Sequence, residues 1–231
     1  MKRFWTDVGV EPRENGWQIT LDGRPLRTQR GAAQVVPTLA LAELLAQEWR
    51  AQGEQIDPRG FPLRDLIDFA LDEVQAGPDA AIERLLGFAR TDTLCYRADP
   101  DEPLYRRQLT LWEPLLAACE ARHAIRLDRT SGIAYRAQPA ASIDTLREGL
   151  ATLDHFTLAA LLTLASLATS LVVALAALEP EADAAALFAA SNCEEDWQAE
   201  LWGWDEEAES ARETRLAAFT MATRVVAALR A

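Results

Sequence analysis

The first part of the chain alternates apolar and polar residues in the way that β-strands do. This alternation is clearest from Trp17 to Leu21, and Asp22-Gly23 follows directly as a two-residue hairpin signal. Two further short strands are predicted between residues 26 and 36. A sheet this small is not stable alone, so we predict an antiparallel, β-rich N-terminal domain over residues 1–50, with its boundary between 37 and 53.

From residue 39 onward, apolar residues recur every three or four positions, which is the period of amphipathic helices. The predicted helices cover residues 39–52, 63–75, 79–89, 103–123, 142–153, 182–190 and 191–230. Thr38 is expected to cap the first of them, and Pro114 is expected to kink or split the fourth. A small hairpin is predicted over 125–137. The pattern therefore predicts an α+β protein whose larger domain, 51–231, is an α-helical, orthogonal bundle-like domain.

One stretch of the helical region, Phe156 to Leu178, carries no charged residue over 23 positions. A helix of this length would measure about 34 Å, which is enough to cross a membrane. Thr163, Ser166 and Ser170 nevertheless share one face, and the acidic flanks lack the basic residues that orient a membrane span. We therefore predict a single buried helix near 156–178 and no membrane insertion.

The stretch from Ser191 to Glu209 combines three of the seven Trp residues with eight acidic side chains. A capping box of Ser191 and Glu194 is predicted to start one continuous helix here. On that helix an apolar stripe would pack inside the fold, formed by Trp197, Leu201 and Trp204. Trp202 lies off this stripe, where it either anchors a partner or packs on another helix. The acidic residues fit a solvated face, a partner-binding face or a metal site.

Composition narrows the choice of partners. The formal net charge is −13 and the pI is about 4.6, so nucleic acid and anionic membranes are poor partners and a basic protein surface is a better one. Three widely spaced cysteines without a C-x-x-C motif argue against a disulfide framework or a zinc thiolate site. No apolar leader is visible after Met1. A reducing cytoplasm is therefore expected.

Few features of the sequence support enzyme chemistry. It has no G-x-S-x-G motif, and its 11 glycines are scattered, so neither a catalytic triad nor nucleotide binding is expected. Residues 120–123 form one E-x-x-H, whereas di-iron bundles use two, and His155 lacks the required Glu. No cofactor or bound metal is expected. The rival hypothesis is a metal-dependent hydrolase that uses the acidic cluster 194–209 with His123 or His155.

Seven collinear segments, which together span nearly the whole chain, carry a resemblance to a known family. They are K-R-F-W at 2–5, L-D-G-R-P-L-R-T at 21–28, V-P-T-L-A-L-A-E-L-L-A-Q-E-W-R-A-Q-G at 36–53, I-D-P-R-G-F-P-L at 56–63, R-T-D-T-L-C-Y-R at 90–97, L-W-E-P-L-L at 111–116 and E-E-D-W-Q-A-E-L-W-G at 194–203. The sequence resembles the assembly chaperones that bind the α subunit of the F1 sector of ATP synthase in mitochondria and some bacteria. Trp204 departs from the resemblance, because a polar residue is usual after W-G.

The resemblance implies a β-rich domain followed by a larger helical domain, and a role that is not enzymatic. It implies that the protein binds the free α subunit and prevents its aggregation until it pairs with the β subunit, in the bacterial cytoplasm or, in eukaryotic relatives, the mitochondrial matrix. It also implies that acidic residues of the C-terminal domain matter, with Glu194, Glu195, Asp196 and Glu200 as candidates by position. The pattern of the stretch adds Trp202, Asp205 and Glu206 as partner-binding candidates.

Overall fold

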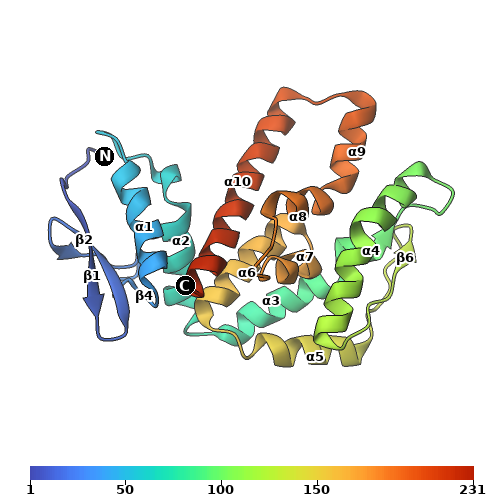
Figure 1. Cartoon of the computed structure of the whole chain (residues 1–231), viewed down its shortest axis with the longest axis horizontal. Helices are drawn as coiled ribbons and strands as arrows, with labels where there is room; N and C mark the ends of the chain where they lie inside the picture. The colour runs from blue at the N-terminus through green and yellow to red at the C-terminus, as the bar shows by residue number, and fades with distance from the viewer. The chain divides into compact units, whose positions relative to one another are not determined.

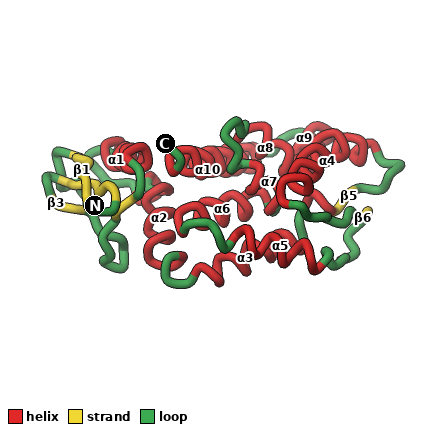
Figure 2. Tube along the Cα trace, turned by 60° about the horizontal axis from the view of Figure 1, so that its bottom comes forward, coloured by secondary structure: helices red, strands yellow, loops and turns green.

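Two units make up the structure, a computed structural model that describes all 231 residues (Figure 1). The first unit comprises residues 1–78, 154–160 and 224–231, and the second comprises 79–153 and 161–223. Strands dominate the N-terminal part and helices the remainder (Figure 2), so the α+β prediction is confirmed. The predicted boundary between 37 and 53 stays a prediction.

The first unit contains a four-stranded sheet in which β2 is the central strand. Its strands are β1 (Val8–Arg13), β2 (Gly16–Leu21), β3 (Arg24–Pro25) and β4 (Val35–Val36), and β2 pairs antiparallel with each of the others. The turn between β2 and β3 is at Asp22-Gly23, where φ is +48° and +75°. A type I′ turn needs positive φ at both residues, so the predicted hairpin is confirmed together with its cause.

Helix α1 (Leu39–Ala51) packs against β1 and β2. Thr38 caps it as predicted, because its Oγ1 accepts a hydrogen bond from the backbone N of Leu41 at 3.1 Å. A 3-10 turn, η1 (Pro58–Gly60), then leads to α2 (Pro62–Phe69), which continues as the π-helical turn η2 (Ala70–Val74). The predicted helix over 63–75 is therefore present but changes its hydrogen-bond pattern near its middle.

The second unit is mainly helical. In chain order its elements are α3 (Pro78–Arg90), η3 (Thr93–Cys95), β5 (Tyr96–Arg97), α4 (Pro103–His123), β6 (Thr130–Ser131), α5 (Ala140–Leu150), α6 (His155–Ala168), α7 (Leu171–Ala176), α8 (Ala184–Ser191), α9 (Cys193–Trp202) and α10 (Glu206–Leu229), with α6 and α10 contributing residues to both units. Helix α4 anchors this unit, since its buried Trp112 donates a hydrogen bond to the carbonyl of Ala190 at 2.7 Å.

One prediction for this unit is wrong, and of the two outcomes expected at Pro114 the structure excludes the split. The residues 125–137 do not form a hairpin, because β6 pairs in parallel with β5, placing Thr130 beside Tyr96. Helix α4 is not split, since it runs through Pro114 from Pro103 to His123. Asp154 caps the next helix, accepting a backbone hydrogen bond from Phe156 at 2.9 Å.

The uncharged stretch 156–178 is two helices and not the single helix predicted. The chain turns between α6 and α7 at Thr169, whose φ is +48°, an unfavourable value for a β-branched residue. Ser170 caps α7, with its Oγ accepting from the backbone N of Val173 at 3.1 Å. Asp92 stabilises the break by accepting hydrogen bonds from Ser170 Oγ at 2.8 Å and from the N of Val172 at 3.0 Å. No helix in the structure combines the length and apolar character that crossing a membrane requires.

Candidate functional site

The predicted continuous helix from 191 to 230 is wrong, because α9 and α10 are separate helices joined by a short turn. Gly203 has a φ of +87°, a left-handed value that suits a glycine at a helix end, and its N–H bonds the carbonyl of Ala199 at 2.8 Å. The capping box does not form either. Ser191 is the last residue of α8, and its Oγ donates to the carbonyl of Phe188 at 2.8 Å.

The break exposes most of the stripe that was predicted to pack inside the fold. Trp202 is 78% exposed, Leu201 is 56% exposed and Trp204 is 41% exposed, whereas Trp197 is half-buried. We call the three exposed residues the apolar turn. Large exposed side chains gathered in one short segment are typical of binding sites and rarely belong to a core. Trp202 therefore does not pack inside this chain.

Two of the predicted acidic residues on α9 are ion-paired with arginines of α10. Asp196 binds Arg212 through two parallel contacts of 2.7 Å each, from Nε and Nη2 to the two carboxylate oxygens. One turn away, Arg215 Nη2 donates to both oxygens of Glu195 at 2.8 and 2.6 Å. These ion pairs join α9 to α10 through the long arginine side chains. Both carboxylates are therefore neutralised within the chain.

Two more of the predicted acidic residues face α4. Arg107 Nη1 donates to Glu200 at 2.6 Å, and this hydrogen bond lowers the pKa of Glu200 and raises that of Arg107. Glu194 accepts from the amide of Gln108 at 2.8 Å. Helix α9 is thus held on one side by α4 and on the other by α10.

Arginines also lie over the aromatic rings of this region. The guanidinium carbon of Arg212 is 5.4 Å from the ring centre of Phe188 and 5.6 Å from that of Trp204. Arg107 is 5.7 Å from the ring of Trp197. Cation–π contacts act over such distances, so the same arginines that neutralise the carboxylates also contact the tryptophans.

A third group of acidic residues follows the apolar turn at the start of α10. Asp205, Glu206 and Glu207 are exposed, form none of the chain's ion pairs, and line an open hollow of about 580 Å³. The remaining lining residues are Ser210, Ala211 and Thr214. Three of the seven predicted binding residues, Trp202, Asp205 and Glu206, therefore lie at the turn. The Trp202 side chain is exposed, and the two carboxylates have no ion pair within the chain.

A family model described as ATP12 chaperone protein matches residues 2–120, which is just over half of the chain. The chain belongs to this family. The assignment confirms the resemblance to F1 assembly chaperones that the sequence showed.

Two solved structures and one further relative extend the similarity to nearly the whole chain. A point mutant of Atp12p from Paracoccus denitrificans is 39% identical, with a TM-score of 0.91 over 99% of this chain and 98% of that one. The Atu1473 protein from Agrobacterium tumefaciens is 38% identical, with a TM-score of 0.93 over 99% of this chain and 86% of that one. The mitochondrial protein atp12 of Schizosaccharomyces pombe is 27% identical over 219 residues, covering 90% of this chain and 75% of the relative.

The geometry does not favour the rival metal-hydrolase hypothesis for this ATP12-family chain. The structure contains no group of three or more His, Cys, Asp or Glu side chains arranged to hold a metal ion. Glu120 of the E-x-x-H instead accepts hydrogen bonds from Arg129 and from the backbone of Leu127 at 2.7 Å. Burial lowers the pKa of both His123 and His155. Burial also raises the pKa of Cys193 to about 11, so this thiol is a poor nucleophile.

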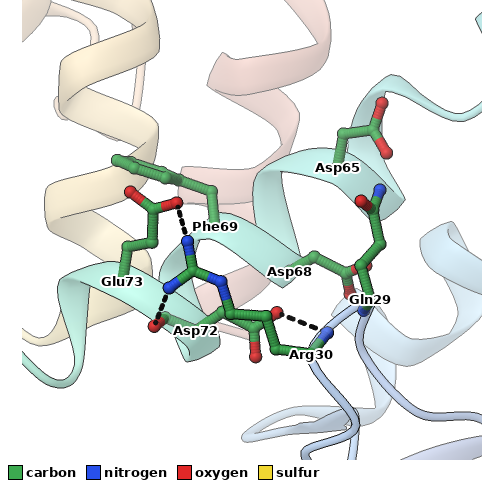
Figure 3. Close-up of a pocket in the computed structure, with 7 residues that line it drawn as sticks. All are labelled: Gln29, Arg30, Asp65, Asp68, Phe69, Asp72 and Glu73. Atoms are coloured by element: carbon green, nitrogen blue, oxygen red, sulfur yellow. Dashed lines mark hydrogen bonds and ion pairs between the residues drawn. The ribbon is translucent and has the colours of Figure 1, made fainter.

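A second acidic hollow, of about 200 Å³, lies in the first unit and was not predicted (Figure 3). Its acids are on α2 and η2, namely Asp65, Asp68, Asp72 and Glu73. Asp65, Asp68 and Asp72 are three and four positions apart, and this helical spacing was the sequence signal that could have indicated the hollow. Arg30 occupies the hollow, donating to Glu73 at 2.7 Å and to the carbonyl of Asp72 at 3.3 Å. Burial raises the pKa of Asp68, which accepts from Gln34. The contacts attach the Gln29–Arg30 turn to the helix, which is a structural role.

Proposed function

We propose that this protein is an ATP synthase assembly chaperone that binds the free α subunit of the F1 sector and prevents its aggregation until it pairs with the β subunit. It acts without catalysis, and in a bacterium it works in the cytoplasm. Membership of the ATP12 family supports the assembly role. The observation that carries the binding role is the apolar turn, in which Leu201, Trp202 and Trp204 are exposed beside unpaired acids.

The chemistry of this surface suits a temporary partner. A subunit that lacks its neighbours exposes an apolar interface, which is an aggregation hazard. Aromatic side chains cover such an interface with a few strong contacts, while charged residues around them speed association and leave release possible. We therefore propose Trp202, Asp205 and Glu206 as direct contacts, and Glu194, in the first turn of α9, as a further candidate.

A light-scattering assay tests the proposal. Purified F1 α subunit is diluted from denaturant with and without the protein, and the β subunit serves as a specificity control. We expect near-equimolar protein to suppress scattering of α but not of β, and immobilised protein to retain α. Unchanged scattering of the α subunit in the presence of the wild-type protein would refute the proposed function.

Matched variants then locate the surface. Serine at all three positions of the apolar turn should abolish suppression of scattering. The control variant places serine at three other large apolar residues that are exposed, Phe4, Ile133 and Tyr135, and should behave as wild type. Equal losses in the two variants would argue that general surface hydrophobicity, and not the apolar turn, is responsible.

A further inference from the structure

Arg212 is the contact between the apolar turn and the core of the second unit. Its guanidinium lies near the fully buried ring of Phe188 on α8 and near the ring of Trp204 in the turn. Gly203, next to Trp204, has a φ of +87°, and a glycine restricts the backbone less than any other residue. The orientation of Trp204 therefore depends on where Arg212 is held.

Asp196 decides where Arg212 is held. The two contacts of 2.7 Å fix both the position and the plane of the guanidinium, and the pair is among the least exposed in the chain. Without this carboxylate, the Arg212 guanidinium would lose both of the contacts that fix its position and plane. It would then leave the rings that it now contacts.

We infer that Asp196 and Arg212 are positioning residues, which hold Trp204 so that the apolar turn presents a shaped surface to the partner without contacting it themselves. The inference rests on the proposed function and separates the predicted binding acids, apart from Glu194, into two groups. The acids with internal arginine partners, Glu195, Asp196 and Glu200, hold α9 in place. The predicted acids Asp205 and Glu206, together with the neighbouring Glu207, face the partner.

Charge complementarity identifies the partner segment that this surface fits. Three neighbouring carboxylates without internal cations border three exposed apolar side chains. The complementary segment of the α subunit places Arg or Lys beside a large apolar residue. An acidic or uncharged apolar segment would leave the carboxylates unpaired in the complex, which is unfavourable.

A double-mutant cycle on capture of purified F1 α subunit tests the positioning role. Asp196→Asn, Trp204→Ala and the double variant are compared by their Kd for the α subunit. If Asp196 acts through Trp204, Asp196→Asn weakens capture roughly tenfold in the wild-type background and leaves it unchanged in the Trp204→Ala background. Additive losses, or no loss from Asp196→Asn alone, would overturn the inference.

Arg212→Lys provides a second arm that does not depend on how Asp196→Asn folds. Lysine keeps the charge but cannot make two coplanar bonds, so the same non-additive loss with Trp204→Ala is expected. Circular dichroism and thermal unfolding are recorded for each variant, and a loss of capture with unchanged unfolding supports positioning. Capture equal to wild type in Arg212→Lys would contradict it. Failure of the wild-type protein to bind α is a different result, which refutes the proposed function itself.

Neutralising the outer acids tests the partner chemistry. The variant Asp205→Asn, Glu206→Gln, Glu207→Gln should slow association with the α subunit several-fold at low salt and reduce the salt dependence of that rate. Its control is Glu209→Gln, Glu213→Gln, which removes two other exposed acids of α10. An unchanged salt dependence in the triple variant would rule out the basic segment.

Discussion

Asp92 and the acids of α9 lie in the same unit and use carboxylates in opposite ways. Asp92 is fully buried, and its hydrogen-bond donors are neutral: Ser170 Oγ, the N of Val172 and the N of Leu94. Burial raises its pKa to about 6. The α9 acids are partly exposed and paired with arginines. The buried carboxylate of Asp92 stabilises the break between two helices, whereas the arginine-paired carboxylates of α9 shape a surface.

The largest expected effect comes from removing the buried carboxylate. Asp92→Ala leaves three donors around the α6–α7 break without an acceptor, so the free energy of unfolding should fall by about 3 kcal/mol. Urea unfolding followed by circular dichroism measures this change. Capture of the α subunit per folded molecule should not change. A variant that unfolds like wild type would show that the break does not depend on Asp92.

A smaller effect is expected from pH. The folded pKa of Asp92, about 6, lies above its ordinary value of 3.8. The stability that protonation confers is therefore complete below pH 3.8 and is lost as the pH rises through 6. Relative to Asp92→Asn, which does not titrate, the wild-type protein should gain about 2 kcal/mol as the pH falls from 7 to 4. A constant difference in unfolding free energy across this range would contradict the assignment.

Glu200 should not titrate in that window. The hydrogen bond from Arg107 lowers the pKa of Glu200 below 4.5, so the stabilising contribution of the ionised form is lost only as the pH falls through that lowered value. Capture of the α subunit measured between pH 5.5 and 7.5 should therefore be constant, even while the unfolding free energy changes. A loss of capture that follows protonation near pH 6 would remove the distinction between the two regions.

A single substitution in the apolar turn should affect capture without affecting stability. Trp202 is 78% exposed, so Trp202→Ala should change the free energy of unfolding by less than about 0.5 kcal/mol and weaken capture of the α subunit about tenfold or more. Isothermal titration and urea unfolding measure the two quantities. A destabilised variant would mean that Trp202 packs inside the fold after all.

The smallest expected effect comes from one exposed ion pair between α9 and α10. The Glu195–Arg215 pair is more than one-third exposed at both side chains, and such pairs contribute about 0.5 kcal/mol or less. Glu195→Gln should therefore be almost neutral for unfolding and cost little in capture. Glu195→Lys should lower stability and capture more than Glu195→Gln, because the new lysine would face Arg215 and the two cations would repel each other. A large loss from Glu195→Gln alone would indicate direct contact with the partner.

Local chemistry explains which parts of the fold could be predicted. Asp22-Gly23 and Thr38 act on the residues next to them, and each was predicted with its role. The break at Thr169 could not be predicted, because its positive φ is maintained by Thr93 and Asp92, far away in the sequence. The parallel pairing of β5 with β6 involves only two residues of each strand, which is too short to produce an alternation of apolar and polar residues in the sequence.

The candidate site was predicted in part. The stretch was identified from its acids and tryptophans, but the ion pairs of its acids were not predicted, because their cations lie on other helices, at Arg107, Arg212 and Arg215. The turn itself left a signal. Gly203 is a typical helix stop, and Asp205 before Glu206 and Glu207 is a typical helix start. Tertiary contacts then determined which acids were left unpaired.

The exposed tryptophans also create a risk for the protein that carries them. An apolar turn able to cover a partner's interface could equally cover the same turn on a second copy. Each copy carries Asp205, Glu206 and Glu207 beside that turn and a formal net charge of −13, so two turns that approach each other bring like charges together. The like charges of the acidic border oppose contact between two such turns, and the same charges favour the cationic client proposed above.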